Sequence, residues 1–191
     1  MKKIYILMGN PDKEGTLSSQ IADTYEQEAR AAGHEVRRAN ISDLAFDPIL
    51  HKGYKVIQAL EPDLLKTQDD LKWAEHFVLI YPLWWSATPA LLKGFFDRMW
   101  LPGFCFHFWK NGMGWDRLMK GKTARVITLS KMSPLLIRFM FGDFTNEIAS
   151  ATLGMAGYNV RLTEIGGSET LTDSAKKRVM ARIGKLAKAA R

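Results

Sequence analysis

Two adjacent tryptophans and a serine follow an apolar run near the middle of this 191-residue chain. The run, residues 77–81, has the β-branched and aromatic composition of a strand buried on both faces. Pro82 ends the strand because it has no N–H to donate, and Pro89 starts a helix where a missing N–H costs least. Aromatic residues in the loop between them favour a planar, stacked ligand, although paired tryptophans are also common in cores and interfaces. The candidate residues are Pro82, Leu83, Trp84, Trp85 and Ser86.

A second candidate site lies at the start of the first predicted helix. Thr16 and Ser18 stand there, beside backbone N–H groups and the positive end of a helix dipole, which together attract a phosphate. Their hydroxyls can donate further hydrogen bonds, but Thr16 also suits the plain role of a helix N-cap. The loop is neither a Walker loop nor a GxGxxG turn.

A third loop, residues 130–134, follows another apolar run and is small and polar. Its composition alone is that of an ordinary surface loop. The three loops together carry more weight, because the carboxyl ends of neighbouring parallel strands meet at one edge of a doubly wound sheet, where ligands bind. We therefore expect one ligand site built from all three.

Apolar runs alternate with helical segments along the whole chain, which predicts right-handed crossovers and a parallel sheet covered on both faces. The expected fold is a doubly wound α/β three-layer sandwich, formed by residues 1–191 as a single domain, with its five parallel strands in the flavodoxin-like order 2-1-3-4-5. The expected strands are residues 4–8, 35–41, 77–81, 123–129 and 159–165. The expected helices are residues 17–32, 62–73, 89–100, 146–155 and 173–191, and residues 42–60 are expected to be irregular.

Composition narrows the functional classes. No apolar run is long enough to span a membrane, and the apolar start of the chain is too short for a signal peptide. Cys105 is the only cysteine, so an internal disulfide is impossible and a cytoplasmic location is expected. Residues 173–191 hold seven Lys or Arg and one Asp, which accounts for +6 of the net charge of +7. We interpret this segment as a solvated helix face, with attraction to an anionic membrane or nucleic acid as the alternative, and no nucleic-acid motif is present.

The residues around the paired tryptophans resemble a known family, the flavodoxin-fold NAD(P)H:quinone oxidoreductases. This family includes mammalian DT-diaphorase, bacterial drug-modulator quinone reductases and potassium-efflux ancillary flavoproteins. Its PLxWxxxPAxLKGWxxR block is similar to Pro82-Leu83-x-Trp85…Pro89-Ala90-x-Leu92-Lys93-Gly94-x-Phe96-Asp97-Arg98. The weaker similarities are Gln68 and Leu71 upstream of this block, the loop from Gly9 to Ser18, and the stretch from Leu153 to Tyr158.

The resemblance implies a tightly bound flavin and assigns residues to it. The expected flavin-binding residues are Asn10, Thr16, Leu17, Ser18, Pro82, Leu83, Trp84, Trp85, Ser86, Ser130, Lys131, Met132 and Ser133. The first loop would hold the phosphate, the second would line the isoalloxazine ring, and the third would cover its pyrimidine edge. Phe106 and Phe108 fall where the family places aromatics over the quinone pocket of a partner subunit, so the resemblance also implies a homodimer.

The chain departs from the family pattern in informative places. Asn10 stands where many members have His, and the Ser-Lys-Met-Ser sequence of the third loop differs from the TTGG of the FAD-binding mammalian type. That difference favours FMN, with FAD as the alternative. Phe141 stands where a His would relay protons, and a phenyl ring cannot do so. No catalytic side chain is therefore assigned.

The activity that the resemblance implies is hydride transfer from NAD(P)H to quinones or similar flat electrophiles, including azo or nitro compounds. Because both substrates would use one flavin face, ping-pong kinetics are expected. The alternative is a flavin-binding regulatory subunit of a membrane transporter, suggested by the basic C-terminal segment and the apolar residues 135–141. A small electron carrier is disfavoured, because such carriers are usually acidic and this chain is basic.

Overall fold

The computed structural model describes residues 1–145 and 147–190, and its centre is a five-stranded parallel sheet. The strand order is β2-β1-β3-β6-β7, which confirms the predicted 2-1-3-4-5 arrangement of the five sheet strands. Parallel pairing holds across the sheet, as the aligned pairs Ile4↔Val36, Ile4↔His76 and His76↔Thr123 show. The strands are β1 (Lys3–Met8), β2 (Glu35–Asn40), β3 (His76–Pro82), β6 (Thr123–Leu129) and β7 (Asn159–Ile165).

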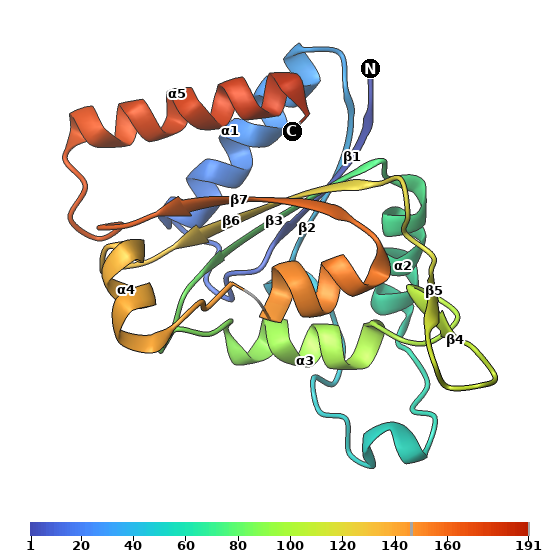
Figure 1. Cartoon of the computed structure of the whole chain (residues 1–191). Helices are drawn as coiled ribbons and strands as arrows, with labels where there is room; N and C mark the ends of the chain where they lie inside the picture. Colours follow the sequence, from blue (N-terminus) through green and yellow to red (C-terminus); the bar gives the residue numbers. More distant parts are fainter. Residues whose placement is uncertain (146, 191) are drawn as a thin grey trace.

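Helices cover both faces of this sheet, so the molecule has three layers (Figure 1). One face is covered by α1 (Leu17–Ala31) and α5 (Asp173–Ala189), and Ile21 and Ile183 pack there against the strands. The other face is covered by α2 (Pro62–Trp73), α3 (Ala90–Met99) and the π-helix η3 (Glu147–Gly154). β1 and β3 are almost wholly buried, because both of their faces meet helices.

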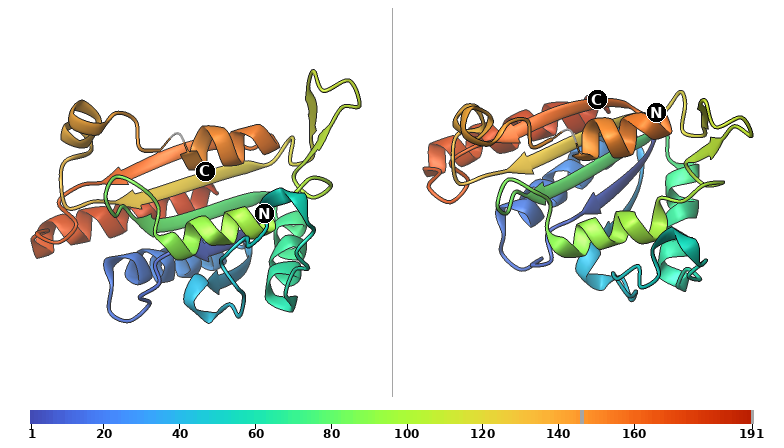
Figure 2. Two further views of the ribbon diagram at one scale, coloured as in Figure 1. Left: turned by 90° about the horizontal axis from the view of Figure 1, so that it is seen from below. Right: turned by 60° about the horizontal axis from the view of Figure 1, so that its bottom comes forward.

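Three elements differ from the sequence prediction. Residues 134–141 form helix α4 (Pro134–Phe141), which was not predicted as an element. A hairpin of β4 (Phe106–Phe108) and β5 (Trp115–Arg117) projects from the far end of the sheet (Figure 2). Within the helix expected over 146–155, the structure has the π-helix η3 (Glu147–Gly154). Asn146 of that expected helix and Arg191 of the expected last helix lie outside the described residues. The segment 42–60, which was expected to be irregular, contains two short 3₁₀ helices or parts of them: η1 (Ile41–Asp43) at its start and η2 (Gly53–Lys55) in its middle.

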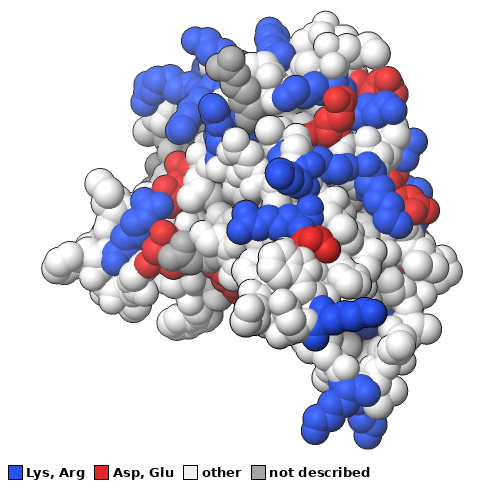
Figure 3. Space-filling model, turned by 45° about the vertical axis from the view of Figure 1, so that its right-hand side comes forward, with Lys and Arg blue, Asp and Glu red and all other residues white. Residues whose placement is uncertain are grey.

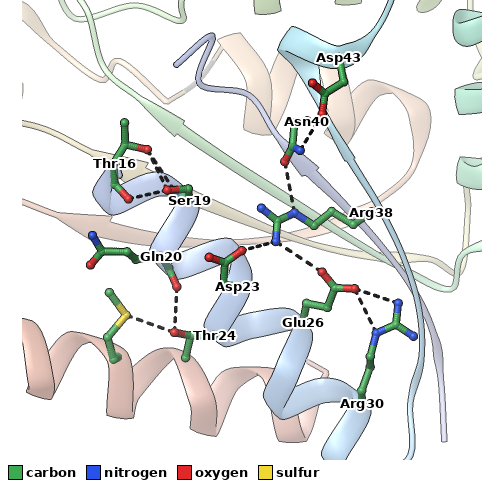
Figure 4. Close-up of polar contacts among 11 residues, drawn as sticks. Thr16, Ser19, Gln20, Asp23, Thr24, Glu26, Arg30, Arg38, Asn40 and Asp43 are labelled. Atoms are coloured by element: carbon green, nitrogen blue, oxygen red, sulfur yellow. Dashed lines mark hydrogen bonds and ion pairs between the residues drawn. The ribbon is translucent and has the colours of Figure 1, made fainter. Parts of the chain in front are cut away.

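On the face shown in Figure 3, basic side chains outnumber acidic ones, and most of the acidic groups lie beside a basic one. Figure 4 shows one such group, in which Arg38 of β2 bonds to Asp23 and Glu26 of α1. These pairs attach the edge strand to its covering helix. α5 is different: among the described residues, Lys188 with Glu28 is its one ion pair, so most of its basic side chains remain uncompensated.

The single cysteine lies inside the molecule. Cys105 is buried, and its thiol donates a hydrogen bond to the carbonyl oxygen of Leu101 at 3.4 Å. Burial raises the pKa of the thiol to about 12. Within the described part of the chain, no helix is long and apolar enough to cross a bilayer.

A buried histidine at the amino end of the sheet should make stability depend on pH. His76 bonds to the Tyr25 hydroxyl at 3.1 Å and to the Thr123 hydroxyl at 2.8 Å. Burial, with the positive charges of Lys2 and Arg125 nearby, lowers its pKa from 6.5 to about 3. Between these pH values the unfolded chain binds a proton that the folded chain does not, so stability falls as the pH falls below 6.5.

We expect the free energy of unfolding to drop by about 2 kcal/mol from this group between pH 7.5 and pH 5.0. Urea unfolding of the wild type and of His76→Gln at both pH values measures it. The difference between the two pH values should be smaller in the variant by that amount. An equal pH dependence in both proteins would contradict the assignment.

Candidate functional site

The three candidate loops lie side by side at the carboxyl edge of the sheet. The amide of Gly9, directly after β1, donates to the Ile80 carbonyl of β3 at 2.7 Å. The amide of Leu83, directly after β3, donates to the Leu129 carbonyl of β6, also at 2.7 Å. The loops that leave β1, β3 and β6 therefore begin next to one another, as the parallel register requires.

The first loop ends in a helix terminus with unused donors. Thr16 is the N-cap of α1, and its hydroxyl oxygen accepts from the Ser19 amide at 3.2 Å. Within the described residues, the amides of Leu17 and Ser18 have no hydrogen-bond acceptor. Asn10 and Ser18 are buried beside this terminus, with 3.4 Å between the Asn10 Nδ2 and the Ser18 Oγ. Thr16 therefore has the role of a helix N-cap, which was the alternative to phosphate binding that its position in the sequence suggested. The free amides of the two residues that follow it still favour an anion.

The second loop makes a tight turn in a conformation that its residues disfavour. Trp84 and Ala87 bond to each other through both backbone groups at 3.0 Å, which closes a two-residue hairpin. Trp85 and Ser86 have φ of 53° and 58°, the pattern of a type I′ turn that normally takes Asn and Gly. Each left-handed non-glycine residue costs about 1 kcal/mol or more, and such strain gathers at functional sites.

The exposed groups of this turn suit a flat ring. The Trp85 indole is fully exposed and Trp84 is about half exposed, so neither belongs to the core. The amides of Trp85 and Ser86 donate to no other described residue, and they are therefore available to a ligand. Pro82 and Leu83 hold the base of the turn at the end of β3.

The third loop is braced by the segment after β7. The Ser130 hydroxyl donates to the Met132 carbonyl at 2.8 Å, and the Ser130 carbonyl accepts from the Ser168 amide at 3.0 Å. Gly166 lies so close that a Cβ there would be 2.6 Å from the Pro134 ring. Lys131 is exposed and pairs with Glu169 at 3.1 Å, and Ser133 begins α4. Glu169 and Gly166 are neighbours of the site that were not predicted, since only a turn was expected there.

Phe106 and Phe108 lie at the opposite end of the molecule from these loops (Figure 2). Their rings pack edge to face with centroids 5.0 Å apart. Together with α3, η3 and residues 53–58 they line an apolar cavity of about 690 Å³. One chain alone therefore does not bring these two residues to the flavin-binding candidates.

Several residues of the recognised sequence block have structural roles. Gly94 lets the 47–61 segment approach α3, because a Cβ there would be 2.5 Å from the Pro48 carbonyl oxygen. Arg98 is buried on the same helix and bonds to Glu61 and to backbone carbonyls of that segment. Gln68 of α2 donates to the Met99 carbonyl at 3.0 Å, which fixes the end of α3. The block thus holds α3 in place beneath the second loop.

The residues present fit a flavin phosphate ester. Free amides at the start of α1 suit the phosphate, and free amides at the Trp85 turn suit the polar edge of the ring. Exposed indoles and the small residues of the third loop suit a flat ring that lies between them.

Comparison with known proteins agrees with this geometry. A family model described as flavodoxin-like fold matches residues 2–183. A protein of Haemophilus influenzae named "Uncharacterized NAD(P)H oxidoreductase" is 28% identical over 179 residues, which cover 90% of this chain and 87% of that protein. An NAD(P)H:quinone oxidoreductase from Methanothermobacter marburgensis superposes with a TM-score of 0.81 at 20% identity, over 100% of this chain and 99% of the other.

A second solved structure holds a ligand. An FMN-dependent NADH-azoreductase from Bacillus anthracis, solved in complex with FMN, superposes with a TM-score of 0.73 at 17% identity, over 98% of this chain and 100% of the other. At this identity the likeness shows the shared fold. With the family model matching nearly the whole length, the chain belongs to the flavodoxin-like fold family.

Proposed function

We propose that this protein is a flavin-dependent NAD(P)H oxidoreductase that reduces quinones or similar flat electrophiles. The observation that carries the proposal is the meeting of three loops at one sheet edge, two of which present unused backbone donors. The sequence relative named as an NAD(P)H oxidoreductase and the structural neighbour named as a quinone oxidoreductase support the same reaction class.

The chain supplies binding, orientation and electrostatics. The bound flavin supplies the hydride chemistry. The Leu17 and Ser18 amides and the hydroxyls of Thr16 and Ser18 bind the phosphate. The Trp85 and Ser86 amides would donate to the polar edge of a bound flavin, and the strained turn keeps them oriented for that contact. The indoles exclude water from the stacking surface.

We propose FMN as the flavin. Ser130, Lys131, Met132 and Ser133 form a short loop directly before α4, and Lys131 already pairs with Glu169. The FMN complex of the structurally similar azoreductase supports the same choice.

We also propose that the active form is a homodimer. Phe106 and Phe108 are too far from the three loops to cover the site of their own chain, whereas the hairpin that carries them projects from the molecule. A second copy would bring these rings over the site, and large apolar side chains are enriched in interface cores. Analytical ultracentrifugation of the wild type and of a Phe106→Ser/Phe108→Ser variant tests the assembly.

The absorption spectrum of the purified protein, followed by mass analysis of the extracted cofactor, tests the central proposal. We expect a yellow protein that releases FMN and that oxidises NADH or NADPH when a water-soluble benzoquinone is added. Initial rates at several fixed quinone concentrations should give parallel double-reciprocal lines. A protein that stays colourless after incubation with FMN and with FAD would refute the proposal.

The exposed indole of the second loop gives a specific prediction. Trp85→Asn should preserve the left-handed turn, because Asn tolerates positive φ, but it removes the aromatic surface. We expect kcat/KM for the quinone to fall about fivefold, from the loss of stacking worth roughly 1 kcal/mol, with no loss of thermal stability. Ser86→Gly is the matched control, since it relaxes the same turn and keeps both amides. Equal losses in the two variants would contradict a stacking role.

A further inference from the structure

Helix α4 presents an unusually apolar surface to solvent. Leu135, Phe139 and Phe141 are 76%, 89% and 62% exposed, and Ile137 is the buried anchor of the helix. Leu136 and Met140 are about half exposed as well. Exposed apolar groups are normal when scattered singly, but a contiguous group marks a surface that meets a partner.

This surface lies at the same edge of the molecule as the candidate flavin site. α4 follows directly from the third loop, and the exposed Trp84 and Trp85 stand on the loop of the neighbouring strand β3. Met132, between the third loop and α4, is also partly exposed. Indole rings at this rim suit a water–membrane interface, where rings with an apolar body and a polar edge are favoured, and phenyl rings suit the acyl chains just below it.

The charged residues near this apolar surface indicate which kind of partner it meets. Residues 130–142 contain no Asp or Glu, and their two basic residues, Lys131 and Arg138, pair with Glu169 and Glu164. α5 begins at the same end of the molecule as α4 (Figures 1 and 2), and its first turns carry the exposed Lys176, Lys177 and Arg178. Within the described residues, none of these three makes an ion pair. An apolar surface beside uncompensated basic groups matches an anionic lipid bilayer.

We propose that α4 and the start of α5 dock the protein on the surface of an anionic phospholipid bilayer. α4 places its apolar side chains among the acyl chains near the headgroups, and the lysines of α5 contact lipid phosphates. Docking places the sheet edge that carries the three loops beside the bilayer, while the second copy of the proposed homodimer covers the flavin ring. In this orientation, long-chain quinones dissolved in the membrane are the electron acceptors of the enzyme, an inference that rests on the proposed function.

Flotation with vesicles tests the docking. The flavin-loaded protein is mixed with one of two kinds of vesicle. The neutral vesicles contain phosphatidylcholine alone, and the anionic vesicles contain phosphatidylcholine with about 30% phosphatidylglycerol, which gives them a negative surface potential. We expect binding to the anionic vesicles that weakens with added salt. Leu135→Ser/Phe139→Ser and Lys176→Glu/Lys177→Glu should each weaken it by roughly tenfold or more.

Matched controls change the same residue types elsewhere. Ile49→Ser/Leu65→Ser alters two exposed apolar residues, and Lys52→Glu/Lys55→Glu alters two exposed lysines, all remote from α4. Both control variants should bind vesicles as the wild type does. Turnover of a water-soluble benzoquinone by every variant reports separately on the reductase, and turnover of a vesicle-embedded long-chain quinone should fall only in the two docking variants.

The outcomes separate the two proposals. Failure of the wild type to bind anionic vesicles, or equal binding by the α4 variant, would overturn the docking. A shift of the α4 variant from dimer to monomer in sedimentation, without vesicle binding by the wild type, would assign the patch to a second copy and overturn it too. Vesicle binding by a protein that reduces no quinone would uphold the docking and refute the proposed acceptor.

Discussion

Thr16→Asp should abolish tight flavin binding and leave the fold intact. Aspartate is as good an N-cap as threonine, so it replaces the hydroxyl that accepts from the Ser19 amide. Its carboxylate, however, occupies the terminus that we assign to the flavin phosphate. Two like charges about 4 Å apart near a protein surface repel by about 2–4 kcal/mol, which corresponds to a loss of affinity of roughly 30- to 1,000-fold. Titration of the apoprotein with FMN, followed by flavin fluorescence, measures the change.

The chain contains a matched control for this variant. Thr172 caps α5 in the same way, and its side chain accepts from the Ala175 amide. Thr172→Asp therefore makes the same change of charge at a helix terminus to which we assign no flavin phosphate. It should bind FMN as the wild type does. If Thr16→Asp also retained normal affinity, the phosphate would not bind at the start of α1.

Arg98→Ala should cause the largest loss of stability, about 3–5 kcal/mol. The guanidinium is almost completely buried and bonds to Glu61 at 3.0 and 3.1 Å, to the Ala59 carbonyl at 2.8 Å, and to the Asp47 carbonyl. Burial alone would raise the pKa of Glu61, but the hydrogen bonds from Arg98 and from the Asp47 amide keep it below its ordinary value. Removing the arginine leaves a cavity, unsatisfied carbonyls and an unpaired carboxylate together.

Urea unfolding of the variant checks this value, and Arg30→Ala is its comparison. Arg30 is half exposed, pairs with Glu26 and donates to the Val36 carbonyl at 2.6 Å, and its loss should cost about 1–2 kcal/mol. We also expect the 47–61 segment to become susceptible to proteolysis in Arg98→Ala before the rest of the chain unfolds. Similar unfolding free energies for the two variants would show that Arg98 is not an anchor.

The sheet and the position of the site could be predicted from sequence because both depend on strong local patterns. The apolar runs 77–81 and 123–129 are too short for helices and are bounded by proline or polar turns, which leaves buried strands. Once the strands are parallel, their carboxyl ends must share one edge, so the loops that follow them meet. The first helix ends as expected near residue 32, and Gly33 follows it in the left-handed conformation, with φ of 83°, that is common just beyond a helix end.

Other features escaped prediction for identifiable reasons. Residues 135–141 are apolar throughout, so they carry no period that separates a helix from a strand, although Ser133-Pro134 is a typical helix start. The β4–β5 hairpin has strands of three residues, and its one clear signal is the turn pair Asn111-Gly112. The left-handed turn at Trp85 and Ser86 contradicts residue preference, because the paired hydrogen bonds between Trp84 and Ala87 impose it.

The burial of the single thiol has a consequence for how this protein ages. Reduced flavins can pass electrons to dioxygen and form hydrogen peroxide, and peroxide oxidises exposed thiolates. With its pKa raised to about 12 and no access to solvent, Cys105 is protected for as long as the contacts between α3 and β4 stay closed. The rate at which an alkylating reagent modifies Cys105 therefore measures how often that region opens. Because the chain has no second cysteine, no other thiol contributes to the measured rate.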